Sequence, residues 1–343
     1  MAQLILNHLS KDFGTGKPAV TGVSLKIREG GFLALLGPSG CGKTTVLRMI
    51  AGFEQPSDGE IFLGEWRLAD VNAMVPPEKR NMAMVFQSYA LWPHMSVAEN
   101  VGYPLKVRGL SRDARDTKIR AALEAVRLDA FADRRPADLS GGQRQRVALA
   151  RCLVTDPDVV LLDEPLANLD RHLRQEMEET FREFHVRSRA TMIYVTHDQA
   201  EAMALATDVA VMAEGKLLQV APPQEIYARP EGRIVGGLIG QGAILSLPWP
   251  DQAGREADWS VIREMVSPQA LFTQSFADVL VRPQDVILSD EGLDAAVESA
   301  VFEGERYALR LRLDNGQRLR AFSRRPHAVG DRVRAVIRSA WRL

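Results

Sequence analysis

The sequence predicts an α/β fold with an inserted helical subdomain, followed by a small all-β domain. Over the first 240 or so residues, short aliphatic runs alternate with longer helical stretches, which is typical of α/β domains. Strand patterns disappear between residues 88 and 136, so we expect this segment to be the helical insertion. From residue 241 to 343 the hydrophobic period shifts toward two, which predicts β-strands.

Five continuous apolar runs in the first part are expected to be buried strands. They are Phe32–Leu36, Met82–Phe86, Val159–Leu162, Met192–Val195 and Val209–Met212. Helices are expected at Lys43–Ala51, Ser111–Arg127, Gly142–Val154 and Arg171–His185. Gly52 is expected to end the first of these helices.

The C-terminal domain contains the clearest hairpin pattern. Leucine alternates with arginine along Tyr307–Leu313 and again along Arg318–Ala321. Asp314-Asn315-Gly316 lies between them, and Asn-Gly between alternating strands predicts a tight turn. The alternation favours a barrel wall with one solvated face. The segment Trp249–Phe276 gives no clear pattern.

Composition restricts the class of protein. The 343 residues are enough for two domains and a small third one, at about 150 residues each. Lys and Arg total 43 against 44 for Asp and Glu, so nucleic-acid binding would need a local basic patch. No apolar run approaches the ~18 residues that span a bilayer, and Met1–Ser10 does not resemble a secretory signal. With only Cys41 and Cys152, we expect no disulfide framework, no zinc cluster and a reducing cytoplasmic location.

The segment Gly37–Thr44 matches the phosphate-binding pattern G-x-x-x-x-G-K-[ST], between a predicted strand and a predicted helix. Glycines allow successive N–H groups to point at phosphate oxygens, and the helix N-terminus adds partial positive charge. Lys43 would bind the β- and γ-phosphates, and the Thr44 hydroxyl is a candidate Mg²⁺ ligand. Cys41 is interpreted as a small loop residue, not a catalytic thiol. The expected nucleotide-binding residues here are Gly37, Pro38, Ser39, Gly40, Cys41, Gly42, Lys43, Thr44 and Thr45.

Asp163 and Glu164 directly follow the predicted strand Val159–Leu162. Asp163 is placed to hold Mg²⁺, and Glu164 could polarise an attacking water as a general base. The alternative is a strand that simply ends in two acidic residues, which is weaker beside an intact phosphate loop. The segment Ser140–Gln143 leaves two interpretations open: a capping box that starts a helix, or a second phosphate-facing helix N-terminus.

Together and in this order, the motifs closely resemble those of ATP-binding-cassette (ABC) ATPases, over about residues 1–240. Leu139–Gln143 is similar to the family's signature sequence, Gln87 to its Q-loop glutamine and His197 to its switch histidine. Pro165–Asp170 resembles the D-loop, with Asn168 where a serine is commoner. Phe13 lies where the family places an aromatic side chain for stacking on adenine.

The resemblance implies a P-loop NTPase that acts as a head-to-tail dimer of two copies of the chain, enclosing two ATP molecules with Mg²⁺. The signature residues of one copy would complete the γ-phosphate site of the other; these are Ser140, Gly141, Gly142 and Gln143. Asp170 would carry signals between the two sites.

The resemblance also assigns the roles in hydrolysis. Glu164 would act as the base, while His197 would position the γ-phosphate and the water. Gln87 would sense Mg²⁺, which Thr44 and Asp163 would also hold. Catalysis of this kind consists mainly of positioning and charge stabilisation, to which Lys43 would contribute its charge.

Among ABC proteins, the resemblance is to importer ATPases. Residues 89–101 are similar to the importer segment that receives a permease's cytoplasmic coupling helix. Tyr89 and Trp92 are therefore expected to be exposed aromatics that a partner covers, with packing inside the helical subdomain as the alternative. Val281–Val286 resembles part of the oligonucleotide-fold-like (TOBE) extension, here 241–343, for which regulation and dimerisation both remain open.

The implied partners are two transmembrane permease subunits and, indirectly, an extracytoplasmic solute-binding protein. We therefore expect a peripheral protein on the cytoplasmic face of the inner membrane. Residues 89–100 and the compact length look most like the ferric-iron and polyamine branch, with sugars or oxyanions as alternatives. A non-transport role on nucleic acid or ribosomes is the remaining alternative, because such β-folds bind oligonucleotides elsewhere, but we expect no nucleic acid.

Overall fold

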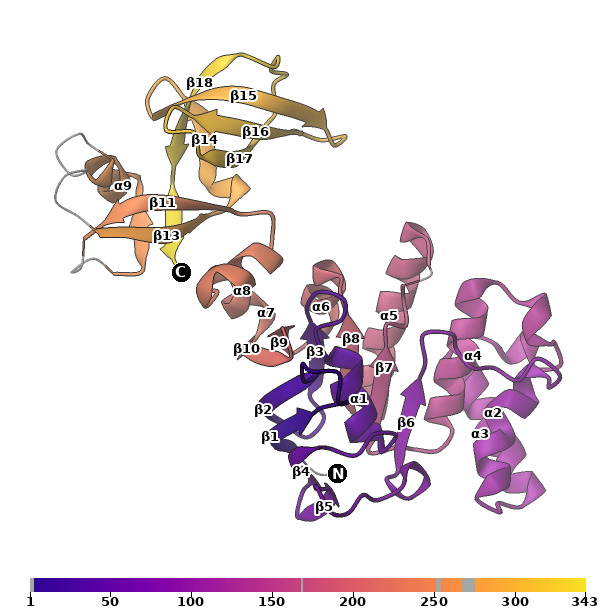
Figure 1. Ribbon diagram of the computed structural model, residues 1–343. Helices are drawn as coiled ribbons and strands as arrows, with labels where there is room; N and C mark the ends of the chain where they lie inside the picture. The colour runs from indigo at the N-terminus through magenta and orange to yellow at the C-terminus, as the bar shows by residue number, and fades with distance from the viewer. Residues whose placement is uncertain (1–2, 168, 251–253, 267–274) are drawn as a thin grey trace. The chain divides into compact units, whose positions relative to one another are not determined.

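The computed structural model describes residues 3–167, 169–250, 254–266 and 275–343 (Figure 1). The chain forms two compact units that divide after Pro223. The glycines near residue 240 predict a division between residues 240 and 241. The structure divides earlier, so the two helices between residues 223 and 238 fall almost entirely within the second unit. Asn168 of the expected D-loop lies outside the described residues.

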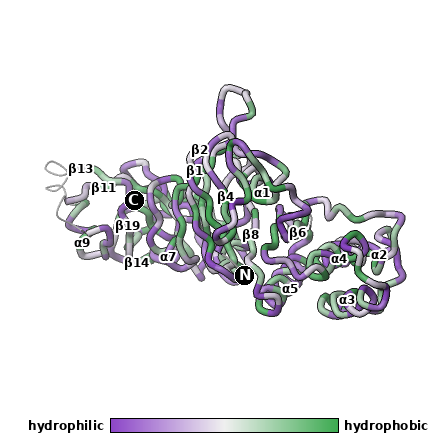
Figure 2. The backbone as a smooth tube through the Cα atoms, turned by 90° about the horizontal axis from the view of Figure 1, so that it is seen from below, coloured by the Kyte–Doolittle hydropathy of each residue, from purple (hydrophilic) through white to green (hydrophobic). Residues whose placement is uncertain are grey.

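The first unit is organised around a six-stranded sheet with the order β10-β9-β3-β8-β7-β6. The strands are β3 (Phe32–Leu36), β6 (Met82–Val85), β7 (Val159–Asp163), β8 (Thr191–Thr196), β9 (Asp208–Ala213) and β10 (Lys216–Ala221). All neighbours pair in parallel except β9 and β10. The five predicted strands are therefore confirmed, and their carboxyl ends meet at one edge of the sheet. Figure 2 shows hydrophobic segments among the labelled strands of this unit.

A second, antiparallel sheet has the order β2-β1-β4-β5 and is not foreseen in the sequence. Its strands are β1 (Leu4–Lys11), β2 (Val20–Ile27), β4 (Asp58–Leu63) and β5 (Trp66–Ala69). Helix α1 (Lys43–Ala51) buries Val46, Leu47 and Ile50 in a core shared with residues of both sheets. The predicted helix end at Gly52 is confirmed, because Gly52 adopts a left-handed φ of 86°.

The helical subdomain follows β6, as predicted. It contains α2 (Val97–Val107), α3 (Arg112–Ala125) and α4 (Gly141–Leu153), and α5 (Arg171–Ser188) and α6 (Gln199–Leu205) follow β7 and β8. Short 3₁₀ helices occur at Pro77–Lys79, Asp129–Phe131 and Pro136–Asp138. Leu123 and Val126 belong to the buried core, and Ile119 packs against it. No helix in the described part of the chain is long and apolar enough to span a membrane.

The second unit contains two antiparallel sheets, ordered β11-β13-β19-β12 and β14-β18-β15-β16-β17. Its elements are α7 (Pro223–Ala228), α8 (Gly232–Leu238), β11 (Ala243–Trp249), β12 (Glu256–Asp258), α9 (Trp259–Met265), β13 (Ser275–Val281), a 3₁₀ helix (Pro283–Asp285), β14 (Val286–Ser289), β15 (Leu293–Phe302), β16 (Tyr307–Leu313), β17 (Arg318–Ser323), β18 (Arg332–Ile337) and β19 (Ser339–Arg342). The predicted hairpin is confirmed, because β16 pairs with β17 and Leu309 and Leu311 are buried. Helix α9 lies in the segment that gives no clear sequence pattern.

Candidate nucleotide site

The phosphate loop connects β3 to α1, and its glycines are required by the backbone. A Cβ at Gly37 would lie 2.1 Å from the carbonyl oxygen of Met212, and one at Gly42 would lie 2.4 Å from that of Ala19. Gly40 and Gly42 also adopt left-handed φ angles of 77° and 103°. At Gly40 a Cβ would meet nothing within 4 Å, so the loop is open on that side.

Lys43 is the first residue of α1, and its side chain turns back across the loop. Its Nζ donates hydrogen bonds to the carbonyl oxygens of Gly37 at 2.8 Å and Pro38 at 3.0 Å. The residue is buried, although it carries a full charge. Cys41 is buried beneath it, which agrees with a small packing residue in the loop.

Thr44 and Asp163 meet, although they are far apart in the sequence. The Thr44 hydroxyl donates a 3.0 Å hydrogen bond to Oδ1 of Asp163, the last residue of β7. Burial raises the pKa of Asp163, and the neighbouring Glu164 carboxylate adds to this, while the bond from Thr44 opposes it. A carboxylate held in a site that penalises its charge is suited to a cation.

Glu164 and His197 follow the adjacent strands β7 and β8. Oε2 of Glu164 lies 3.3 Å from Nδ1 of His197. Glu164 has a left-handed φ of 44°, which is costly for a residue with a Cβ, and its N–H donates to the carbonyl oxygen of Val195. The fold therefore holds the backbone of Glu164 in a strained conformation, which places its carboxylate at the sheet edge.

Gln87 and Phe13 lie in the loops that follow β6 and β1. Because β6 pairs in parallel with β7, Gln87 emerges at the same sheet edge as Asp163. Phe13 is 52% exposed, and the Lys11 ammonium lies 4.9 Å from its ring centroid. Both side chains are exposed and could contact a ligand.

Ser140 and Gln143 form the capping box that the sequence allowed. The Ser140 hydroxyl accepts a 3.3 Å hydrogen bond from the Gln143 N–H, and the Gln143 side chain accepts one from the Ser140 N–H at 2.9 Å. Helix α4 packs mainly against the other helices and β6, not against α1. Asp170 caps α5 by accepting from the Leu173 N–H. In the described part of the chain, the hydrogen bonds of Ser140, Gln143 and Asp170 start the helices α4 and α5 and do not reach the phosphate loop.

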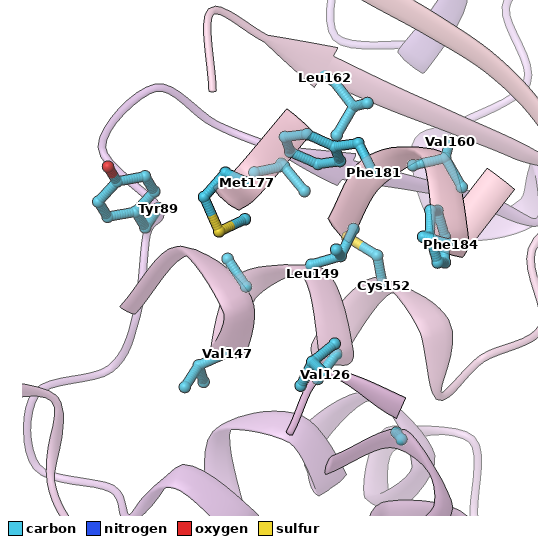
Figure 3. Close-up of a cluster of buried hydrophobic side chains, with 14 of the residues drawn as sticks. Tyr89, Val126, Val147, Leu149, Cys152, Val160, Leu162, Met177, Phe181 and Phe184 are labelled. Atoms are coloured by element: carbon cyan, nitrogen blue, oxygen red, sulfur yellow. The ribbon is translucent and has the colours of Figure 1, made fainter. Parts of the chain in front are cut away.

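The predicted exposure of Tyr89 is wrong. Tyr89 is only 9% exposed and belongs to a hydrophobic core that includes residues of the helical subdomain, β7 and α5, and Figure 3 shows Tyr89 at the edge of this cluster. Trp92 is half-buried, with its ring 4.4 Å from that of Tyr103. The internal-packing alternative therefore holds for Tyr89, because its backbone turns the ring inward.

Sequence reasoning missed a buried polar cluster behind His197. Glu201 on α6 accepts hydrogen bonds from the hydroxyl groups of Tyr194 at 2.8 Å and Thr196 at 2.7 Å. Nε of Arg174 lies 3.6 Å from the other Glu201 oxygen, and Nη1 donates to Asp198. Burial raises the pKa of Glu201. A charged residue on a short alanine-rich helix was the one available sequence signal.

The fold and site agree with known proteins. Residues 20–167 match the family model described as ABC transporter, and residues 279–341 match the TOBE domain model. Among solved structures, the dimeric post-hydrolysis state of the ATP-binding cassette MJ0796 bound to ADP and Pi has a TM-score of 0.57 and 28% identity. That similarity covers 64% of this chain and 98% of the other.

Two curated relatives extend the comparison. The chain is 42% identical over 322 residues to the Fe(3+) ions import ATP-binding protein FbpC 1 of Haemophilus influenzae, covering 92% of this chain and 95% of that protein. It is 49% identical over 244 residues to the sn-glycerol-3-phosphate import ATP-binding protein UgpC 1 of Rhizobium johnstonii, and this match covers 71% of this chain and 65% of that protein. The chain therefore belongs to the ABC transporter family, as an import ATPase subunit with a C-terminal TOBE domain.

Proposed function

We propose that this protein hydrolyses ATP with Mg²⁺ to drive the import of ferric iron through separate permease subunits. The observation that carries the proposal is the meeting of three strand ends at one sheet edge. The phosphate loop follows β3, Asp163 and Glu164 follow from β7, and His197 follows β8. Ligands of α/β sheets bind at the carboxyl ends of the strands.

The chemistry of the loop fits a nucleoside triphosphate. The open side at Gly40 and the N-terminus of α1 would present N–H groups to phosphate oxygens. Lys43 would exchange its carbonyl partners for the β- and γ-phosphates, which bind an ammonium more strongly than neutral carbonyls do. Phe13 offers an exposed ring for adenine.

The donor set fits Mg²⁺. Thr44 and Asp163 supply a hydroxyl and a carboxylate oxygen 3.0 Å apart, and Gln87 would add an amide oxygen from the next strand. Within the described ranges, no group of three His, Cys, Asp or Glu side chains could hold a metal alone. This suits Mg²⁺, which keeps several waters and binds through few protein ligands and substrate phosphates. When bound, Mg²⁺ would neutralise charge on the β- and γ-phosphates.

Glu164 and His197 would perform the hydrolytic step. Glu164 would accept a proton from the attacking water, because its carboxylate is partly exposed at the strand end. His197, 3.3 Å away, would hold that carboxylate in place and contact the γ-phosphate. The product of the attack is ADP with inorganic phosphate.

We propose that two copies of the chain assemble head to tail around two nucleotides. The start of α4 carries an exposed serine and two glycines, whose N–H groups could bind a γ-phosphate on a second copy. Gln143 would hold this turn, and Asp170 would lie between the two sites. The dimeric MJ0796 cassette supports this assembly by its overall similarity.

The relatives support the partners and the cargo that we propose. We propose two permease subunits and an indirect link to an extracytoplasmic solute-binding protein, which would place this chain at the cytoplasmic face of the inner membrane. The match to the Fe(3+) import protein covers 92% of this chain, whereas the match to the sn-glycerol-3-phosphate protein covers 71%. The longer match, which leaves little of the C-terminal unit outside it, favours ferric iron over polyamines, sugars or oxyanions.

The test is a pull-down from native membranes with tagged Glu164→Gln, ATP and Mg²⁺. Two hydrophobic permease subunits should be recovered, and the same preparation without ATP and Mg²⁺ is the control. The reconstituted complex should then hydrolyse ATP faster when its solute-binding protein carries ferric iron. Ribosomes, nucleic acid or no membrane protein would contradict the import proposal, and stimulation by a sugar or oxyanion would contradict the cargo.

A further inference from the structure

The chain turns sharply directly after Gln87. Tyr89 and Ala90 both adopt left-handed φ angles, 62° and 46°, although both carry a Cβ. The Tyr89 N–H donates to the carbonyl oxygen of Phe86 at 2.8 Å, which closes the turn. Strained backbone of this kind persists only where surrounding contacts hold it, and such strain is common at functional sites.

One side chain holds both strained residues. The Arg151 guanidinium donates through Nη2 to the carbonyl oxygen of Tyr89 at 2.8 Å and through Nη1 to that of Ala90 at 2.7 Å. Its central carbon lies 5.0 Å from the ring centroid of Trp92. Arg151 is only 9% exposed, so these bonds are shielded from water. A planar guanidinium suits two adjacent carbonyls better than an ammonium does.

Arg151 stands in the last turn of α4, whose first residue follows Ser140. At a rise of 1.5 Å per residue, the two ends lie about 16 Å apart along one helix. Val147, Ala148 and Leu149 in the middle of α4 are fully buried, in a core that α4 shares with α2, α3 and residues of the sheet. If α4 moves as a rigid helix, a displacement of the Ser140 turn would also displace Arg151 and the two carbonyls it holds.

The far side of the turn is fixed to the same subdomain. The Asn100 side chain on α2 accepts from the Trp92 N–H at 2.8 Å and donates to the carbonyl oxygens of Trp92 and Met95. Asn100 is completely buried. The segment that begins after Gln87 is thus bonded to the helical subdomain at both ends, while β6 before it belongs to the sheet.

We propose that Arg151 is a positioning residue that locks the Gln87 loop to the signature helix α4, so that the Ser140 turn and Gln87 move as one unit. When a second copy binds nucleotide against Ser140, the displacement would reach Gln87 through this guanidinium. The inference rests on the proposed roles of Gln87 and Ser140. Arg151 touches neither substrate nor metal in this arrangement, and acts only through the two carbonyls.

Arg80 provides a matched control. It is also a buried arginine that binds only backbone carbonyls, and its partners are Met49, Ile50, Leu68 and Val75. These residues lie at the end of α1 and around β5, not in the turn after Gln87. A comparison of Arg80 and Arg151 variants therefore distinguishes the general effect of losing a buried guanidinium from the specific effect of losing the link to Gln87.

The first experiment measures ATP hydrolysis by the full chain in a double-mutant cycle. Arg151→Gln should lower kcat about tenfold while KM for MgATP changes less, because positioning is lost and binding is retained. Combined with Gln87→Ala, it should slow the enzyme no further than the slower single variant. Arg151→Lys should recover part of the rate. In the control cycle, the fold-reductions in kcat caused by Arg80→Lys and by Gln87→Ala should multiply in the double variant, because the two sites are independent.

The second experiment measures amide hydrogen exchange and needs no activity. In Arg151→Lys, exchange should rise in peptides that contain residues 87–96 and stay unchanged at residues 49–53, with the reverse in Arg80→Lys. The proposal is overturned if the reductions in kcat caused by Arg151→Gln and Gln87→Ala multiply in the double variant. It is also overturned if amide exchange at residues 87–96 is unchanged in Arg151→Lys. If Gln87→Ala alone leaves kcat unchanged, the proposed role of Gln87 fails, and the exchange result then decides the mechanical link.

Discussion

Nδ1 of His197 lies 3.3 Å from Oε2 of Glu164, across the ends of two neighbouring parallel strands. The strand pairing holds both backbones, because Asp163 is in register with Val195 and the Glu164 N–H donates to the Val195 carbonyl oxygen. A ring at this distance restricts the rotamers of the carboxylate. The pair is therefore oriented before substrate arrives, as the proposed role of Glu164 as general base would require.

The first prediction concerns Glu164→Gln. The amide keeps the size of the side chain and its contact with His197, but it cannot accept a proton from water. Turnover should fall about 100-fold or more, which is the scale of general-base catalysis, while ATP binding is retained. ATP hydrolysis and nucleotide affinity are measured together, and gel filtration with ATP and Mg²⁺ should reveal a trapped dimer.

The control for this variant is Glu183→Gln. Glu183 is an exposed residue of α5 that pairs with Arg127 at 3.4 Å, so its loss should leave turnover unchanged. Hydrolysis by Glu164→Gln above about a tenth of the wild-type rate contradicts the assignment of the base.

Local sequence information was sufficient for the elements that bind the nucleotide in the proposal. The run Phe32–Leu36 is apolar at every position because β3 is buried on both faces, and α1 begins and ends where the glycines indicate. The hairpin of β16 and β17 was predictable for the same reason, since its turn chemistry is local. Patterns of this kind depend on few distant contacts.

The remaining features depend on distant contacts. Tyr89 is buried because a left-handed turn at two non-glycine residues directs it inward, and no periodicity reveals such a turn. The cluster of Glu201, Tyr194 and Arg174 joins α5, α6 and β8, which only the fold brings together. Sheet β2-β1-β4-β5 combines strands separated by the phosphate loop and α1. Sequence spacing alone does not specify these pairings.

The second prediction concerns stability at Arg80. Its guanidinium is fully buried and donates to the carbonyl oxygens of Met49 and Ile50 at the end of α1. Burial lowers its pKa to about 10, so it remains charged at neutral pH. Arg80→Ala should lower the free energy of unfolding by about 3 kcal/mol, because buried carbonyls lose their donors.

Chemical denaturation measures this change, and Arg67→Ala is the control. Arg67 is an exposed residue that pairs with Glu60 and Asp70, so its removal should cost less than about 1 kcal/mol. Equal losses for Arg80→Ala and Arg67→Ala would show that the buried bonds contribute nothing beyond a surface pair.

The third prediction concerns the two thiols. Cys41 and Cys152 are both buried, and burial raises the pKa of Cys152 to about 12. Since only the thiolate reacts, Cys152 should react very slowly with a chromogenic aromatic disulfide at pH 8, and Cys41 should react slowly because its burial keeps the reagent away from the sulfur. Both thiols should react at once in denaturant. Ser88→Cys, at an exposed position, is the control and should add one fast thiol. A fast native thiol in the wild type would contradict the burial of the phosphate-loop cysteine.

The fourth prediction concerns pH and Glu201. Burial raises the pKa of this carboxyl above its ordinary value of 4.5, so the folded state binds its proton more tightly than the unfolded chain does. The folded state therefore loses stability as the pH rises from 4.5 through the raised value, and the loss is complete above it. Glu201→Gln keeps acceptor oxygen for Tyr194 and Thr196 and removes this titration.

The unfolding free energy of Glu201→Gln should therefore increase relative to wild type as the pH rises above 4.5, and the two should converge at lower pH. Urea unfolding at several pH values measures the difference. Glu65→Gln, in the exposed turn between β4 and β5, is the control for the same substitution outside the buried cluster. If the difference in unfolding free energy between Glu201→Gln and wild type instead shrinks as the pH rises, the prediction is wrong. In that case Arg174 and the two hydroxyl groups stabilise the ionised carboxylate by more than its burial costs, and Glu201 acts as an anion that holds Arg174 beside His197.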